Sequence, residues 1–359
     1  MKQIITNNPN GYNEKRNIFS RHSVDFVYKR DVFDLGLKIV HKLTRKGYHP
    51  FWKGLYYNFK DQQTPCVFFN SINLGRNPWE VYFETTLPRL GKAPKFFYDI
   101  AVKQLAKDNC KEIIAISQCA YELQLAYLKT TYPKYYGIIK EKMVVKLPPQ
   151  PLLIENYTEK QLPQDKIVFT LVGADFFRKG GREVLQVFNE LIPKYPQLQL
   201  NIVSSLNYGD YATQTTVEDY KNAIKIIEKH RAHIKHYSRL PNNEVLDLFK
   251  KSHVGLLPTW ADSFGYSVLE AQAAGCPVIT TDIRALPEVN DNDIGWIINV
   301  PKLKSKDAIL INKEERVKFS KLLISSLTII INDILKSPGQ IEIKGKICLE
   351  KIIFNNNEI

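Results

Sequence analysis

Residues 256–289 read LLPTWADSFGYSVLEAQAAGCPVITTDIRALPEV. A short apolar strand leads into a polar loop, and a helix then runs over about 267–275 and ends at Gly275, a residue type that commonly ends helices. The loop supplies Asp262 and the helix supplies Glu270, so two carboxylates flank the helix start. Backbone N–H groups there, with Gly265 allowing close approach, favour an anion such as phosphate. A plain strand–loop–helix unit with a capping Asp and a surface Glu accounts for the same residues.

Short apolar runs alternate with amphipathic segments on both sides of this stretch. That alternation predicts an α/β protein whose parallel strands are covered by helices on both faces. We expect strands at 64–72, 80–85, 112–118, 142–149, 167–173, 198–205, 234–238, 253–258, 277–282 and 295–300. We expect helices at 97–107 and 119–130, and helical segments around 314–327 and 347–354.

A proline-rich stretch divides the chain. Pro148, Pro149 and Pro151 cannot continue a strand or a helix, and a polar segment follows them, as in an interdomain linker. We therefore expect one domain over residues 1–157 and a second over residues 165–300. The pattern alone does not place residues 301–359.

The charge is distributed unevenly along the 359 residues, whose formal net charge is +13. Residues 1–160 carry +11 of it, which indicates an anionic partner: nucleic acid, a phosphorylated acceptor or an acidic membrane. A solvated face of a lysine-rich protein is the alternative. No RNP-like motif, helix-turn-helix or zinc finger is visible, so we expect no nucleic acid.

The remaining composition points to a protein inside the cell. The five cysteines are scattered and odd in number, which argues against a disulfide framework. The first twenty residues hold no apolar signal segment, and the longest apolar stretch, 322–331, is about half the length of a membrane span. We expect a cytoplasmic protein, with peripheral attachment to the inner face of the membrane as a further expectation.

The stretch around Asp262 and Glu270 resembles the signature of GT-B retaining glycosyltransferases of family 4, the group 1 type. The likeness includes AQAAGCPVIT after Glu270, LPNNEVLDLFKKSHVGLLPT before Asp262, LPE at 286–288 and LVGADFFRKGGREVLQVFNEL at 171–191. It implies two Rossmann-like, doubly wound domains facing across a cleft, the first binding an acceptor and the second a nucleotide sugar. Two departures stand out: Asp262 replaces a Glu, and Ala174 stands where the family often has an Arg.

The resemblance implies roles for four residues. Glu270 would accept hydrogen bonds from ribose hydroxyls, and Asp262 from hydroxyls of the sugar. Arg178 and Lys179 would neutralise the diphosphate as it leaves, because breaking a glycosyl–phosphate bond builds negative charge. Without the family context, the two cations would be interpreted as a solvated helix start.

The resemblance also implies further contacts with the nucleotide sugar. Backbone N–H groups of the turn from Phe264 to Leu269 would meet the diphosphate. The expected binding residues are Phe264, Gly265, Tyr266, Ser267, Leu269, Gly173, Arg239 and Leu240.

The amino-terminal half resembles the family much less. NNPNGY at 7–12 is a poor substitute for the usual glycine-rich loop. We expect Glu84 and His22 on the acceptor side, although a lone histidine in a polar segment is usually a bystander. Ser117 is predicted to cap a helix.

Metal and cofactor sites are not expected. Asp291-Asn292-Asp293 matches a metal-binding DxD motif, but such clusters are ordinary turn residues. No His, Cys or carboxylate cluster has metal-ligand spacing. We expect no cofactor, with a UDP- or GDP-linked sugar as substrate.

These observations favour a hexosyltransferase that uses a nucleotide-diphospho-sugar and a glycan or lipid-linked acceptor in polysaccharide or glycoconjugate biosynthesis. A catalytically weak or inactive GT-B scaffold, and a basic nucleic-acid-binding protein, remain alternatives. An anionic membrane surface is a further expected partner, because residues 41–60 interleave cations with aromatic rings. The residues in that segment are Lys42, Arg45, Lys46, Lys53 and Lys60, with Tyr48, Phe51, Trp52, Tyr56 and Tyr57.

Overall fold

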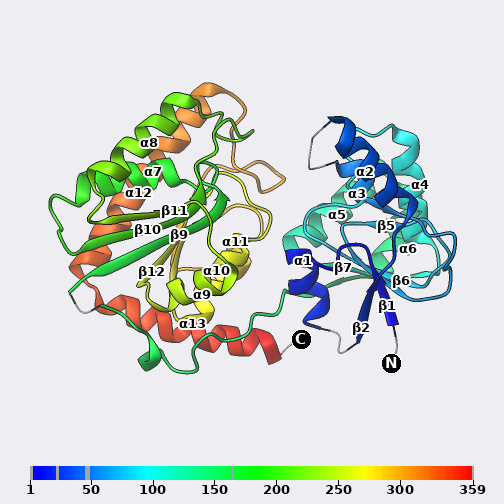
Figure 1. The fold of residues 1–359 in the computed structure, drawn as a ribbon, viewed down its shortest axis with the longest axis horizontal. Coiled ribbons are helices and arrows are strands. Elements are labelled where there is room, and N and C mark those ends of the chain that lie inside the picture. Colours follow the sequence, from blue (N-terminus) through cyan, green and yellow to red (C-terminus); the bar gives the residue numbers. More distant parts are fainter. Residues whose placement is uncertain (1–2, 22–23, 45–48, 164, 358–359) are drawn as a thin grey trace. The chain divides into compact units, whose positions relative to one another are not determined.

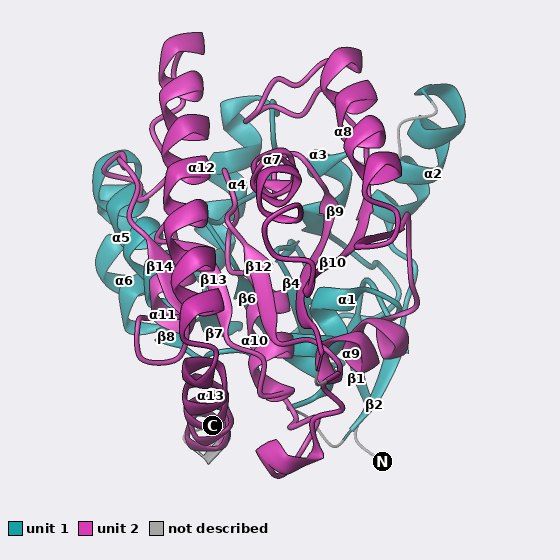
Figure 2. Cartoon of the chain, turned by 90° about the vertical axis from the view of Figure 1, so that its left-hand side faces the viewer, with its two compact units in different colours: residues 1–149, 359 teal, residues 150–358 magenta. Residues whose placement is uncertain are grey.

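The computed structural model describes residues 3–21, 24–44, 49–163 and 165–357. The chain divides into two compact units after Pro149 (Figure 2). This division precedes the expected domain end at residue 157, because the segment after Pro149 is bound to the second unit. Asn356 Nδ2 donates to the carbonyl of Gln150 at 2.8 Å, and Leu153 N donates to the carbonyl of Ala273 at 2.9 Å.

Unit 2 is built on a six-stranded parallel sheet in the order β11-β10-β9-β12-β13-β14. The strands are β9 (Ile167–Asp175), β10 (Leu198–Ser205), β11 (Ile234–Tyr237), β12 (Val254–Leu257), β13 (Val278–Thr281) and β14 (Trp296–Ile298). The chain builds outward from β9 in one direction and then from β12 in the other. The strand order therefore reverses between β9 and β12, where open α/β sheets place their ligands.

Helices cover both faces of this sheet, which explains the nearly continuous apolar runs in its strands (Figure 1). Helices α7 (Gly181–Leu191), α8 (Val217–Lys229) and α12 (Lys313–Lys336) pack together, as do α9 (Asn242–Lys250), α10 (Tyr266–Ala273) and α13 (Gly339–Asn357). The short elements are η3 (Tyr157–Glu159) and α11 (Leu286–Val289). Residues 301–357, which the sequence pattern did not place, thus supply two long helices to unit 2.

Unit 1 has a second six-stranded parallel sheet, ordered β2-β1-β4-β6-β7-β8. The strands are β1 (Gln3–Thr6), β2 (Asp25–Tyr28), β4 (Cys66–Phe69), β6 (Trp79–Phe83), β7 (Cys110–Ala115) and β8 (Met143–Val145), and β3 (Leu55–Tyr56) pairs with β5 (Ile72–Asn73) beside it. Phe68, Val81 and Ile113 are fully buried in its core. Here the order reverses between β1 and β4.

The helical elements of unit 1 are mostly short. They are α1 (Tyr12–Glu14), η1 (Lys15–Phe19), α2 (Val32–Thr44), α3 (Pro50–Lys53), α4 (Lys95–Ala106), α5 (Gln118–Thr131), η2 (Pro133–Tyr135) and α6 (Tyr136–Glu141). Ser117 caps α5 as predicted, because its side chain accepts a hydrogen bond from Ala120 N at 3.0 Å. None of the helices within the described ranges is long and apolar enough to cross a membrane.

The structure confirms the predicted α/β class and the parallel strands in both halves. One element of the membrane hypothesis is wrong: Tyr56 is buried and packs against Phe68 with ring centroids 4.7 Å apart. Arg45, Lys46 and Tyr48 lie outside the described residues.

Candidate functional site

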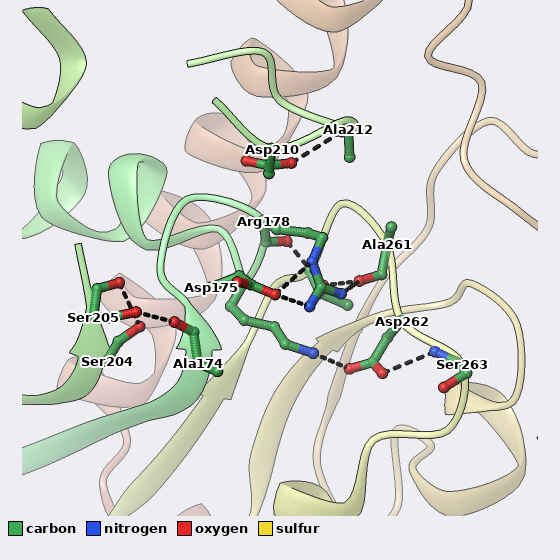
Figure 3. Close-up of polar contacts among 12 residues, drawn as sticks. Ala174, Asp175, Arg178, Ser204, Ser205, Asp210, Ala212, Ala261, Asp262 and Ser263 are labelled. Atoms are coloured by element: carbon green, nitrogen blue, oxygen red, sulfur yellow. Dashed lines mark hydrogen bonds and ion pairs between the residues drawn. The ribbon is translucent and has the colours of Figure 1, made fainter. Parts of the chain in front are cut away.

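The loops after β9 and β12 bring three of the predicted residues together at the reversal point of the unit 2 sheet (Figure 3). Lys179 Nζ donates to Asp262 Oδ2 at 2.5 Å, and each side chain is only 12% exposed. Arg178 Nη1 donates to the carbonyl of Ala261, the residue before Asp262, at 2.8 Å. A segment from one strand end thus holds two cations against a carboxylate from the other.

The charges around Asp262 keep it ionised. Burial by itself would raise the pKa of this carboxyl group, but the charge and hydrogen bond of Lys179 and the charge of Arg178 hold that pKa below its usual value. Oδ1 of Asp262 also accepts a hydrogen bond from Ser263 N at 2.8 Å. A carboxylate has about four lone-pair sites, so these contacts leave capacity for hydroxyl groups of a ligand.

Arg178 is held from two sides. Its guanidinium pairs with Asp175, where Nε lies 3.1 Å from Oδ2. Its carbonyl accepts hydrogen bonds from Trp260 N and Thr259 Oγ1, both at 2.9 Å. Burial would lower the pKa of Arg178, but the hydrogen bond and charge of Asp175 raise it. The cation is therefore positioned before any ligand arrives.

Two glycines let the backbone segments approach this closely. Gly180 has φ +80°, and a Cβ on it would lie 2.2 Å from the carbonyl oxygen of Pro258. Gly265, at the start of α10, has φ +91°, and its Cβ would lie 2.5 Å from the side chain of Leu286. Both positions combine a left-handed backbone with no space for a side chain, so only glycine fits.

Helix α10 carries the second predicted carboxylate. Glu270 lies in the second turn of the helix and is 4% exposed. Phe264 and Leu269 are buried, so their side chains belong to the core and any ligand contact they make is through the backbone. Tyr266 packs against Phe264 with ring centroids 5.1 Å apart.

The other predicted residues lie in several places. Gly173, near the end of β9, lies under Lys179, whose Cγ is 2.7 Å from the position of an added Cβ. Arg239 and Leu240 follow β11, and Arg239 is exposed. Glu84 belongs to unit 1 and pairs with Arg89. His22 lies outside the described residues.

Two residues near the cations were not predicted. Asp175 lies three positions before Arg178, and this i,i+3 spacing of opposite charges could have indicated the ion pair from the sequence. Tyr211 lies in the loop after β10 and is 76% exposed. The charges of Arg178 and Tyr211 each affect the pKa of the other, which places the two groups close together. No sequence pattern links that loop to Arg178.

The acidic cluster at 291–293 forms a turn, as predicted. Asp291 Oδ1 accepts hydrogen bonds from Asp293 N at 2.9 Å and Ile294 N at 3.1 Å, and Oδ2 pairs with Lys351 at 2.9 Å. Within the described part of the chain, no group of three or more His, Cys, Asp or Glu side chains has the geometry of a metal site.

Comparison with known proteins gives this site a family context. Residues 154–321 match the family model of glycosyl transferases group 1. The matched region contains Arg178, Lys179, Asp262 and Glu270, and it ends within α12.

Relatives with curated names match the chain over part of its length. A D-inositol 3-phosphate glycosyltransferase of Corynebacterium aurimucosum is 25% identical over 139 residues, 38% of this chain and 32% of that protein. The capsular polysaccharide biosynthesis glycosyltransferase CapM of Staphylococcus aureus is 27% identical over 158 residues, 43% of this chain and 39% of that protein. The chain thus spans about a third of the length of the curated relatives it matches.

Solved structures resemble the whole chain. A glycosyltransferase from Rickettsia africae has a TM-score of 0.58 at 13% identity, covering 99% of this chain and 86% of that one. Anabaena Alr3699/HepE, solved in complex with UDP, has a TM-score of 0.57 at 11% identity, covering 100% of this chain and 98% of that one. Together with the two parallel sheets, these likenesses confirm the predicted GT-B fold.

Proposed function

We propose that this protein is a retaining glycosyltransferase of family 4 that transfers a hexose from a UDP- or GDP-linked sugar to a glycan or lipid-linked saccharide. The acceptor would belong to polysaccharide or glycoconjugate biosynthesis. The observation that carries the proposal is the contact of Lys179 and Arg178 with the loop that presents Asp262. The group 1 family match over residues 154–321 supports it.

The arrangement suits the cleavage of a glycosyl–phosphate bond. Negative charge develops on the leaving diphosphate, and preorganised cations in a partly buried site stabilise that charge most effectively. Lys179 uses one of its three N–H donors on Asp262 in this structure, which leaves two for phosphate oxygens. No divalent metal is needed for this role, and we propose that none is used.

The buried carboxylates would bind the two ends of the sugar donor. Glu270 would accept hydrogen bonds from the ribose hydroxyls, as the family resemblance implies. Asp262 would bind hydroxyls of the hexose. The direct contact between Lys179 and Asp262 supports a shared role for the cation and the carboxylate at the hexose–phosphate junction.

We also propose that unit 1 attaches to anionic membranes. The side chains of Leu35, Ile39 and Leu43 recur every fourth residue on α2 and are exposed, so they form one apolar stripe on a helix with no buried residue. Lys38 and Lys42 lie beside the stripe. Cations that flank an exposed apolar stripe suit the headgroup layer of an anionic membrane.

Release of UDP or GDP from UDP- and GDP-hexoses, with an extract of saccharide acceptors, tests the proposed activity. Glu270→Gln should weaken nucleotide binding by about 10- to 100-fold, because an amide replaces one charged acceptor oxygen by a donor. Glu228→Gln, an exposed position on α8, is the matched control. Nucleotide binding without release would identify an inactive scaffold, and unchanged affinity in Glu270→Gln would refute the role of Glu270.

A further inference from the structure

Unit 1 contains a pocket of about 590 Å³ formed entirely by its own residues. Its walls come from the loops that follow β1, β2 and β4, together with the first turns of α2 and with α3. These strands are neighbours in the sheet, and the strand order reverses between β1 and β4. The pocket thus occupies the position in unit 1 where parallel α/β sheets bind ligands.

Side-chain amides in the pocket offer unused hydrogen-bonding capacity. Asn7 Nδ2 donates to Ser71 Oγ at 2.7 Å, and Ser71 Oγ donates to the carbonyl of Lys53 at 2.7 Å. The Oδ1 atoms of Asn7 and Asn70 are buried and have no hydrogen-bond partner among the described residues. A buried amide oxygen without a partner destabilises the protein until a donor reaches it, and ligand hydroxyl groups are suitable donors.

Three carboxylates line the pocket, and one of them is buried. Glu14 is 6% exposed, and burial raises its pKa to about 6. Gly11 leaves space for this carboxylate, because a Cβ there would lie 1.8 Å from Glu14 Oε2. Asp31 and Asp34 line the same pocket from the start of α2. A buried acid whose pKa is shifted upward toward neutral pH is typical of a functional site.

The net charge of the pocket is opposite to that of the surrounding unit. Its lining has three carboxylates, Glu14, Asp31 and Asp34, but only two cations, Lys53 and Arg89. Arg89 is already paired with Glu84, and Asp34 Oδ2 lies 3.2 Å from Lys38 Nζ, so the comparison that remains is of two carboxylates, Glu14 and Asp31, with Lys53. The excess positive charge of the amino-terminal half therefore lies elsewhere, and a phosphate group in this pocket would be repelled.

An aromatic side chain completes the lining. Trp52 lines the pocket from α3, and its ring is fixed by Phe51 and Phe33, with centroids 5.2 and 6.1 Å away. Gly36 on α2 lies against the same ring, where a Cβ would come within 2.2 Å. Amides and carboxylates that accept hydroxyl protons, next to a rigid aromatic ring, are the groups that a sugar ring requires.

We infer that this pocket binds an uncharged saccharide unit of the acceptor and discriminates against phosphorylated sugars. The inference rests on the proposed glycosyltransferase function and adds the chemical class of the acceptor. It separates this chain from relatives whose name specifies an inositol phosphate. The discrimination comes from Glu14 and Asp31, and the affinity from the Asn7 and Asn70 amides with Trp52.

Saturation-transfer NMR on the full chain tests this inference. The probes are glucose, mannose, galactose and N-acetylglucosamine, each compared with its own 6-phosphate, with and without UDP or GDP. At least one neutral sugar should bind at least about tenfold more tightly than its phosphate, through the charge repulsion described above. Equal or tighter binding of every phosphate, or no binding of any neutral sugar, would overturn the inference.

Variants identify the pocket as the binding site. Glu14→Gln should reduce the preference for the neutral sugar by about tenfold, and Asp31→Asn provides a second reduction if Glu14→Gln does not fold. Glu141→Gln, an exposed position on α6 in the same unit, should leave the preference unchanged. A preference that survives both pocket variants would overturn the inference. Nucleotide binding in the same samples separates the two proposals: saccharide binding without nucleotide binding would refute only the glycosyltransferase function.

Discussion

Replacing Glu14 by Gln should stabilise unit 1, but only at pH values at which the carboxyl group of Glu14 would be ionised. Burial raises the pKa of Glu14 from 4.5 to about 6 in the folded protein. Because the folded state keeps the proton to a higher pH than the unfolded state, the free energy of unfolding falls as the pH rises from about 4.5 to about 6. One pKa unit corresponds to about 1.4 kcal/mol, so the full cost is about 2 kcal/mol above that range.

Glu14→Gln has the shape of the protonated acid and cannot ionise. It should therefore be about 2 kcal/mol more stable than the wild type at pH 8 and nearly equal to it at pH 4. Burial also raises the pKa of Asp31 to about 6. Asp31 contributes equally to the free energy of unfolding of both proteins, so its contribution cancels in the difference.

Urea unfolding from pH 4 to pH 8 measures this difference. Hydrogen exchange of peptides from β4 and β6 reports the opening of unit 1 separately from that of unit 2. Glu141→Gln is the control and should show no pH-dependent difference. A Glu14→Gln variant that is less stable than the wild type at pH 8, or a difference that does not change with pH, would refute the reasoning.

The remaining predictions concern the sugar-donor site and the membrane. Replacing Arg178 and Lys179 together by Ala should lower turnover more than sugar-donor affinity, and equal losses would indicate simple binding. Lys179→Ala alone should destabilise unit 2 by about 3 kcal/mol, because the buried Asp262 loses its ion-pair partner. Adding Asp262→Asn should restore stability in thermal unfolding but not turnover. Activity should survive EDTA, and loss with recovery on adding manganese or magnesium would contradict metal independence. The protein should sediment with phosphatidylglycerol vesicles at about 0.05 M salt and be released at about 0.5 M, since salt screens the attraction. Leu43→Glu should weaken this binding, whereas Ile329→Glu, at an exposed position on α12, should not. Wild-type protein that stays in the supernatant at low salt would contradict membrane attachment.

The sequence was most informative for unit 2. The strand β9 was predictable because an apolar run rich in β-branched residues is typical of a buried strand. The loop with Asp262 was predictable because strand, glycine and helix signals follow one another closely. These signals are local, so they can be recognised without knowing what packs against them. The same helix signal led to Glu270, whereas Lys179 was singled out only by the family resemblance.

Unit 1 was harder for the same physical reason. Strands β1 and β2 have four residues each and α2 buries none, so their patterns are too short or too exposed to indicate a core. Asn7 and Glu14 carry no local sign of a pocket. Only the pairing of β1 with β2 and β4 brings their loops together with α3 and Trp52.

The sequence by itself determined the α/β class and the parallel strands and, through the family resemblance, indicated the types of charged group at the proposed sugar-donor site. The tertiary structure alone decided which groups meet. Asp175 with Arg178 could have been inferred from their spacing, but Lys179 with Asp262 spans 83 positions, and Arg178 with Tyr211 joins loops after different strands. Contacts of this kind depend on strand order, since parallel strands bring their carboxyl ends to one edge of the sheet irrespective of their separation in sequence.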